Sequence, residues 1–130
     1  MGFKILLVDD SKTTRKVIAK TLRMAKVPID ELFEASNGKE ALEVLGEKWI
    51  DLVLADINMP VMNGIEMIEK MSEEGMLKNI PVIMVSTVGS ETRIEQLKTK
   101  GVKAYIRKPF LPEVIGKVVD DILGVEDMAA

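Results

Sequence analysis

Short apolar runs alternate with amphipathic segments five times along this chain, and the alternation limits its fold more than any other feature. Continuous apolar runs of this length indicate strands that are buried on both faces of a parallel sheet. Strands that alternate with helices predict an α/β fold with right-handed crossovers. The expected strands are 4–8, 31–35, 51–55, 81–86 and 104–107.

The segments between these runs carry apolar residues at helical spacing, bounded by residues that begin or end helices. Ser11 is suited to cap the first helix, and Val27-Pro28 to stop it. Gly101 is suited to end the fourth helix, and Pro112 to stand in the first turn of the last. The expected helices are 12–26, the segment after Asn37-Gly38, the segment after Asn63-Gly64, 91–100 and 112–123.

Length and composition predict a single domain. The chain has 130 residues, 47% of them hydrophobic and 30% charged, which is an ordinary balance for a globular protein. We expect one domain over 1–124 and a short tail over 125–130, with no internal linker. The formal net charge of −3 argues against binding to a nucleic-acid backbone.

Two residue types are absent from the sequence, cysteine and histidine. Their absence excludes disulfides, thiolate or imidazole metal sites, and phosphohistidine carriers. A metal ion here would be held by oxygen atoms, which favours Mg²⁺, Mn²⁺ or Ca²⁺. No apolar stretch approaches the roughly 20 residues of a membrane span, and the first strand follows Met1 too closely for a signal peptide. We therefore expect a cytoplasmic protein.

Charged residues follow three of the expected strands. Asp9-Asp10 ends the first run, Asp56 ends the third and Lys108-Pro109 ends the fifth. Ligands of open parallel sheets bind beyond the carboxyl ends of the strands, so these side chains are expected to meet at one edge. Three carboxylates that meet repel one another unless a divalent cation and a phosphoryl group compensate them.

The clusters belong to four longer motifs, which are Leu7-Val8-Asp9-Asp10, 54–64 from Leu54 to Gly64, 82–86 from Val82 to Ser86, and Tyr105-Ile106-Arg107-Lys108-Pro109-Phe110. These motifs stand in the same order and spacing in response-regulator receiver domains. The chain resembles this family, and within it the stand-alone chemotaxis regulators, over about 3–123. The resemblance implies a flavodoxin-like (βα)5 three-layer sandwich, with a five-stranded parallel sheet of order 2-1-3-4-5.

The resemblance also implies a site and its chemistry. Asp56 would accept a phosphoryl group from a histidine kinase, and Lys108 would contact that group. Mg²⁺, with Mn²⁺ as a substitute, would be held by Asp9, Asp10, Asp56 and the backbone carbonyl of Asn58. Aspartate carboxylates are competent nucleophiles toward phosphorus, which fits the assignment of Asp56.

Further residues would convert phosphorylation into a change of shape. Ser86 matches the hydroxyl that contacts the phosphoryl group, although a shift of one residue would give that role to Thr87. Tyr105 matches an aromatic switch residue, with plain edge packing as the alternative. Lys108-Pro109 matches a bond that is usually cis in the family. The surface expected to change comprises 91–100, the fifth strand and the last helix.

One departure from the family pattern and one hypothesis concern the loops around the site. Asn63 stands before Gly64 where the family often has Asp, which is a small change in turn chemistry. Asn58 and Val88 follow Asp56 and Ser86 by two residues. We hypothesise that these two side chains set how easily water attacks the acyl phosphate, so charged replacements should change the rate of autodephosphorylation.

The implied function is a signalling switch that is not an enzyme beyond its own phosphorylation and dephosphorylation. Its partners would be a histidine kinase and a target protein, such as a flagellar motor switch, and in addition a phosphatase. A relay intermediate and a phosphate sink remain alternative roles. Two other classes are disfavoured. A flavin carrier would need a phosphate-binding loop in place of Asp9-Asp10, and a Mg²⁺-dependent phosphatase would need an Asp-x-Asp pair there.

Overall fold

The computed structural model describes residues 2–75, 77, 79–86, 102–107 and 111–123. Its strands are all parallel and form one sheet in the order β2-β1-β3-β4-β5, which confirms the expected fold. The elements, in chain order, are β1 (Phe3–Val8), α1 (Lys12–Met24), β2 (Ile29–Ala35), α2 (Gly38–Glu47), β3 (Leu52–Ala55), α3 (Gly64–Glu73), β4 (Val82–Ser86), β5 (Val102–Arg107) and α5 (Pro112–Leu123).

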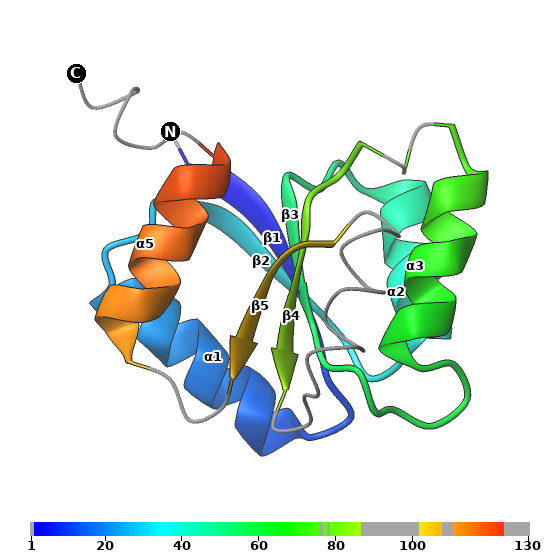
Figure 1. Cartoon of the computed structure of the whole chain (residues 1–130), viewed down its shortest axis with the longest axis horizontal. Coiled ribbons are helices and arrows are strands. Elements are labelled where there is room, and N and C mark those ends of the chain that lie inside the picture. The colour runs from blue at the N-terminus through cyan, green and yellow to red at the C-terminus, as the bar shows by residue number, and fades with distance from the viewer. Residues whose placement is uncertain (1, 76, 78, 87–101, 108–110, 124–130) are drawn as a thin grey trace.

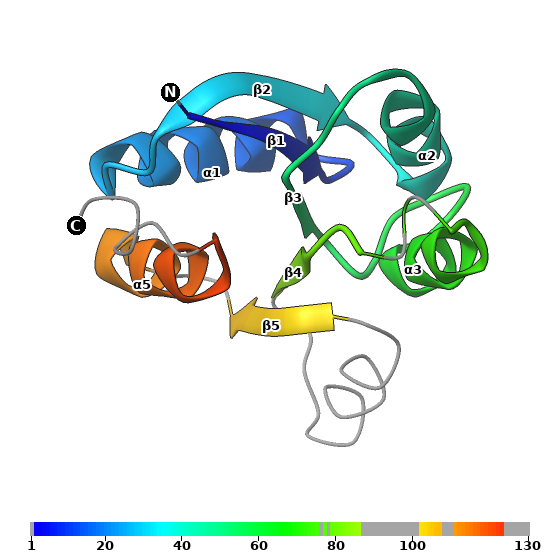
Figure 2. The same ribbon diagram turned by 90° about the horizontal axis from the view of Figure 1, so that it is seen from above.

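The sheet lies between two layers of helices (Figures 1 and 2). The pair α1 and α5 covers one face, and the pair α2 and α3 covers the other. Successive side chains of a strand point to opposite faces, so each strand feeds both cores. Leu6 and Val8 pack toward α2 and α3, whereas Ile5 and Leu7 pack toward α1 and α5. None of the helices in the described residues is long and apolar enough to cross a bilayer.

Several boundaries differ from the sequence-based expectation. Strands β1, β2 and β5 begin one or two residues earlier than expected, because they continue their pairing with neighbouring strands. Strand β3 begins at Leu52, one residue later than expected. Asp51, the residue before β3, contacts β1 through its side chain, since its carboxylate accepts the Lys4 backbone N–H at 2.8 Å. The helix expected over 91–100 lies outside the described residues.

Helix α1 ends at Met24, two residues before the expected end at Lys26. The Val27 N–H reaches back to the Leu22 carbonyl at 3.1 Å, and the Lys26 N–H bonds to the Arg23 carbonyl at 3.0 Å. These two bonds form a Schellman motif, which requires a left-handed residue after the C-cap. Lys26 takes that conformation, with φ of 61°. The turn chemistry therefore stops the helix before Val27-Pro28 can.

We expect Lys26→Gly to stabilise the protein. Glycine adopts a positive φ without the steric cost that a side chain brings, although it also makes the unfolded chain more flexible. The Lys26 side chain is exposed, so little packing is lost. The free energy of unfolding should rise by up to about 1 kcal/mol, which urea titration would measure. Lys20→Gly, placed inside α1, should lower it by about 1 kcal/mol.

Candidate functional site

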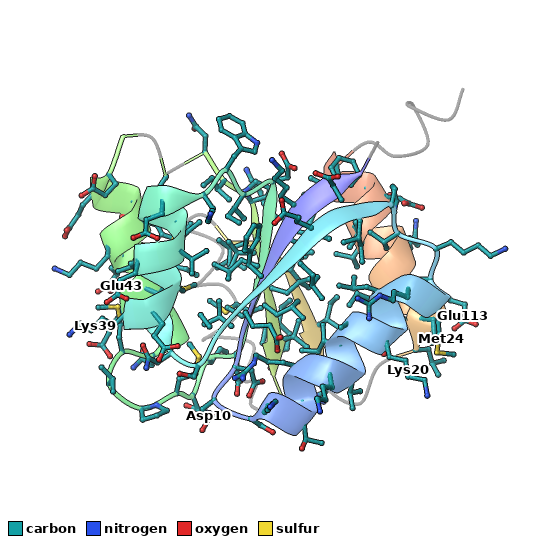
Figure 3. All side chains as sticks on the ribbon, turned by 180° about the vertical axis from the view of Figure 1, so that it is seen from behind. Asp10, Lys20, Met24, Lys39, Glu43 and Glu113 are labelled. Atoms are coloured by element: carbon teal, nitrogen blue, oxygen red, sulfur yellow. The ribbon has the colours of Figure 1, made fainter. Side chains whose placement is uncertain are left out.

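Asp9, Asp10 and Asp56 meet at the carboxyl edge of the sheet, as the sequence predicted. One carboxylate oxygen from each lies within 4.8 Å of the other two. Strand β1 pairs with β3 so that Val8 faces Ala55, which places the residues that follow the two strands side by side. Asp10 is seen at this end of the molecule in Figure 3.

Asp9 is fixed more firmly than the other two acids. It is only 2% exposed, and its Oδ1 accepts the Ser11 backbone N–H at 2.9 Å. Its own N–H donates to the Ala35 carbonyl of β2 at 3.1 Å. Ser11 also caps α1 by accepting the Thr14 N–H. The turn that begins α1 therefore also orients the Asp9 carboxylate.

Asp56 stands at the end of β3 and is half-buried. Its backbone N–H donates to the Val8 carbonyl at 2.9 Å, which continues the pairing of β3 with β1. Its Oδ1 accepts the Ile57 backbone N–H at 2.8 Å, which fixes the orientation of the carboxylate. A half-buried and oriented carboxylate is accessible to a reactant from solvent.

The three side chains form a set of donors suited to a hard cation. They supply only carboxylate oxygens, the ligands that Mg²⁺ prefers. Asp9 is buried, Asp56 half-buried and Asp10 exposed, so a cation would contact both protein and solvent. Mg²⁺ usually keeps several water ligands, and an open site of this kind leaves room for them. The residues present therefore fit a magnesium ion.

Comparison of the sequence with known protein families gives one match that covers most of the chain. Residues 5–120 match the response regulator receiver domain. The chain belongs to this family. The membership agrees with the resemblance read from the four motifs, and it favours a receiver over a flavin carrier or a phosphatase. A receiver domain is a signalling switch within two-component systems.

Individual relatives of this receiver domain include chemotaxis proteins. A chemotaxis protein CheY homolog of Campylobacter jejuni is 38% identical over 122 residues, covering 93% of this chain and 92% of the relative. The structure of the chemotaxis protein CheY4 of Vibrio cholerae is similar with a TM-score of 0.83 at 31% identity, covering 94% and 99%. The phosphorylated cyanobacterial phytochrome response regulator RcpA has a TM-score of 0.81 at 28% identity, covering 96% of each chain.

The loop after Asp56 holds the receiver's α3 very close to the site. The Gly64 N–H donates to the Ile57 carbonyl at 2.9 Å. A Cβ on Gly64 would lie 2.4 Å from the Asp56 carbonyl oxygen, so only glycine fits without movement. Asn63 caps α3 by accepting the Glu66 N–H at 2.9 Å, and the Glu66 carboxylate accepts the Asn63 N–H at 3.2 Å. Asn63 and Glu66 therefore form a capping box that stabilises the start of α3.

The same loop contains a strained turn. The Met62 N–H donates to the Pro60 carbonyl at 2.7 Å, and Val61 between them has φ of 67°. A three-residue turn with a positive φ at its centre is rare, and a β-branched residue is particularly unfavourable there. The Val61 side chain is 76% exposed. The loop that follows Asp56 is thus held in a conformation of raised energy.

Other residues of the expected site are placed only in part. Ser86 ends β4 opposite Arg107 of β5, at the same edge as Asp56. Tyr105 is half-buried and packs against the core on the α2 and α3 side. Asn58 is exposed. Thr87, Val88, Lys108 and Pro109 lie outside the described residues.

Arg15 is a residue of this site that the sequence analysis missed. Its guanidinium donates to the Asp9 backbone carbonyl and forms an ion pair with Glu34 at 2.9 Å. The side chain is only 14% exposed, and it joins the end of β1 to α1 and β2. No local pattern predicts a contact between residues 19 positions apart. An arginine on the first turns of a helix that follows two aspartates was the available signal.

The next loop along this edge, between β2 and α2, is also ordered by carboxylate bonds. The Ser36 hydroxyl and then the Ser36 backbone N–H donate to Glu40, and these bonds lower the pKa of the Glu40 carboxyl. The positive charge of Arg15 acts in the same direction more weakly. Asn37 caps α2 by accepting the Glu40 N–H at 2.9 Å. These bonds order the turn that leads from β2 into α2.

Proposed function

We propose that this receiver domain accepts a phosphoryl group on Asp56 from a histidine kinase in a Mg²⁺-dependent reaction, and that phosphorylation changes its surface for a partner protein. The observation that carries this proposal is the meeting of Asp9, Asp10 and Asp56 within 4.8 Å at the carboxyl edge of the sheet. One of these three, Asp56, combines partial exposure with a fixed orientation. The phosphorylated state of the related RcpA supports the same chemistry.

The residues present account for the steps of such a transfer. An oxygen of the Asp56 carboxylate would form a bond to phosphorus while the bond from phosphorus to the donor histidine nitrogen breaks. Phosphoryl transfer depends on positioning and on neutralisation of charge more than on covalent catalysis. The Ile57 N–H supplies the positioning of Asp56. When bound, Mg²⁺ supplies positive charge, and we propose Asp9, Asp10, Asp56 and the Asn58 carbonyl as its protein ligands.

The product would be an acyl phosphate, whose added charge can reorganise its neighbours. We assign the contact with the phosphoryl oxygens to Lys108 and to the hydroxyl of Ser86, with Thr87 as the alternative. Movement at the end of β4 would reach β5, because Ser86 pairs with Arg107 and Met84 pairs with Tyr105. Tyr105 is half-buried, so a change in its position would alter the surface at β5. The responding surface would comprise 91–100, β5 and α5.

The relatives point to the biological setting. The Campylobacter and Vibrio proteins are named for chemotaxis, and the alignments cover more than nine-tenths of each of those proteins. We therefore propose a chemotaxis role in the cytoplasm, with a histidine kinase as phosphodonor and a component of the motor switch as target. A relay intermediate or a phosphate sink would use the same Asp56 chemistry.

Incubation with acetyl phosphate and Mg²⁺ tests the proposal. Intact mass spectrometry should show the gain of one phosphoryl group, which hydroxylamine removes because acyl phosphates are labile. EDTA should prevent the gain, since the three carboxylates would then repel the entering phosphoryl oxygens. A protein that gains no group in Mg²⁺, or gains as much in EDTA, would contradict the proposal.

We expect Asp10→Asn to stabilise the metal-free protein and to reduce the stabilisation that Mg²⁺ provides. Two unit charges 4 Å apart repel by about 1 kcal/mol in water and about 4 kcal/mol at an effective dielectric of 20. Asp10 is exposed, so the lower figure applies, and the metal-free free energy of unfolding should rise by about 1 kcal/mol. The rise in Tm on adding Mg²⁺ should shrink, because a ligand is lost. Thermal unfolding in EDTA and in Mg²⁺ measures both effects. If Asp10→Asn has a lower Tm than the unaltered protein in EDTA, repulsion among the three carboxylates does not destabilise the metal-free protein.

A further inference from the structure

A groove opens at the edge of the molecule opposite to the acidic site. Two hollows of about 240 and 630 Å³ lie beside each other there, and both are lined by Leu45, Gly46 and Leu77. Helix α2 starts at the carboxyl edge of the sheet and runs back toward the start of β3, so its last residues lie far from Asp56. The residues of this Trp49 groove are Leu42, Leu45, Gly46, Trp49, Leu77 and Ile80.

Trp49, the single tryptophan of the chain, stands at the groove with 73% of its surface exposed. Its indole N–H donates to Asp51 Oδ1 at 2.9 Å, and Asp51 Oδ2 accepts the Lys4 backbone N–H at 2.8 Å. The ring is thus fastened to the first strand of the sheet although it remains in solvent. Tryptophan residues held in this way are frequent centres of protein interfaces, because little entropy is lost when they are covered.

Gly46 lies in the last turn of α2, where none of the residues that the structure describes packs against the position of a side chain. A Cβ built on it meets nothing within 4 Å, and its backbone is ordinary right-handed helix. Glycine weakens a helix relative to alanine, so the fold alone gives no reason for it. A glycine on a helix surface allows another backbone to approach closely. Gly46 lines both hollows, so the absence of a side chain leaves room there for an approaching partner.

Charge indicates what kind of partner fits. The charged residues that line the two hollows are Glu47, Glu73 and Glu74 against Lys48 and Lys70, so acidic groups are in slight excess there. Over their whole length α2 and α3 carry six glutamates and two lysines, whereas α1 carries five basic residues and no acidic residue. Figure 3 shows Lys39 and Glu43 on the side of α2 and Lys20 on the opposite side of the molecule. A basic segment is therefore attracted to the α2 and α3 face and repelled from α1. Two copies of the same acidic face would repel each other.

We infer that the Trp49 groove binds an amphipathic helix of another protein, one whose apolar side chains are flanked by lysine or arginine. Leucine-sized side chains at helical spacing would enter the two hollows and contact Trp49, and the basic residues would face the glutamates of α2 and α3. This site lies away from Asp56, so binding does not depend on phosphorylation. It gives the receiver a second interaction surface, on the opposite side of the sheet from α5.

The single tryptophan reports directly on occupancy of the groove. The probe is a tryptophan-free synthetic peptide of about 18 leucine and lysine residues, patterned so that leucines occupy one helical face. Titration into the full chain should shift the Trp49 emission to shorter wavelength and saturate at one peptide per protein. Gly46→Gln, which adds a side chain to the lining at a position where a Cβ meets no described atom within 4 Å, should weaken binding by about tenfold or more. Asp56→Asn should bind as the unaltered protein does.

Matched variants separate the groove from general attraction by charge. Glu47→Lys and Glu73→Lys together should also weaken binding by about tenfold. Glu113→Lys with Asp121→Lys on α5 changes the net charge equally and should not. Met24→Gln on α1 is the control for Gly46→Gln. No shift in emission, or equal binding by all variants, would overturn the inference. So would a shift that follows protein concentration alone with dimers in sedimentation, because a second copy would then occupy the groove.

Discussion

Asp56→Asn should gain no phosphoryl group from acetyl phosphate under conditions in which the unaltered protein is fully labelled. The amide oxygen of Asn carries no negative charge and is a far weaker nucleophile toward phosphorus than a carboxylate. The Ile57 N–H can still bond the side-chain oxygen, so the loop is expected to keep its shape. Intact mass spectrometry across a time course in Mg²⁺ measures the effect.

Asp121→Asn is the matched control for this substitution. Asp121 is an exposed residue of α5 whose Oδ2 lies 3.6 Å from the Lys117 ammonium, far from the three clustered acids. Exposed ion pairs contribute little to stability, so this protein should fold and be labelled normally. Labelling of Asp56→Asn at the same stoichiometry as the control would show that another residue is the acceptor.

Gly64→Ala should destabilise the protein and slow its phosphorylation. The added Cβ would lie 2.4 Å from the Asp56 carbonyl oxygen and 3.2 Å from the Ile57 Cα, and neither is a flexible side-chain end. Either α3 or the backbone of Asp56 has to move. Overpacking of this kind costs about 3 kcal/mol, which corresponds to a fall in Tm of about 10 °C. Thermal unfolding measures the first effect and the initial rate of labelling measures the second.

Gly46→Ala provides the control for this prediction. The same chemical change in α2 meets none of the described atoms within 4 Å and should raise the free energy of unfolding by about 0.5–1 kcal/mol. Opposite signs for two Gly→Ala substitutions would assign the loss at position 64 to the close approach of α3. If Gly64→Ala instead unfolded within a degree or two of the unaltered protein, the loop would be more adaptable than its contacts indicate.

The strands and the meeting of the three acids could be predicted from the sequence, because both follow from short-range pattern and simple geometry. Buried strands such as Leu52–Ala55 are read from their apolar runs, and parallel strands necessarily place their carboxyl ends together. The meeting of Asp9, Asp10 and Asp56 follows from these two facts. The strand order came from the resemblance to receiver domains, since an alternating pattern alone does not specify which strands are neighbours.

Other features could not be predicted, because they depend on contacts between distant parts of the chain or on a residue that is unusual at its position. The bond network of Arg15 depends on how α1 lies across the ends of β1 and β2. The early end of α1 depends on a left-handed Lys26, and lysine gives no such signal because glycine is the usual residue there. The exposed position of Trp49 depends on a bond from its indole N–H to the carboxylate of Asp51, the residue before β3.

Hydrophobic periodicity and the acids that follow the strands thus determined the class of fold, the edge of the sheet that carries the site and the residues that meet there. Such features are local, and each strand or helix expresses them independently. The tertiary structure alone decided how each carboxylate is oriented, why Gly64 is required beside Asp56, and that a groove with an exposed tryptophan lies at the opposite edge. These depend on distances between separate elements, which packing of the whole chain sets and no run of neighbouring residues encodes.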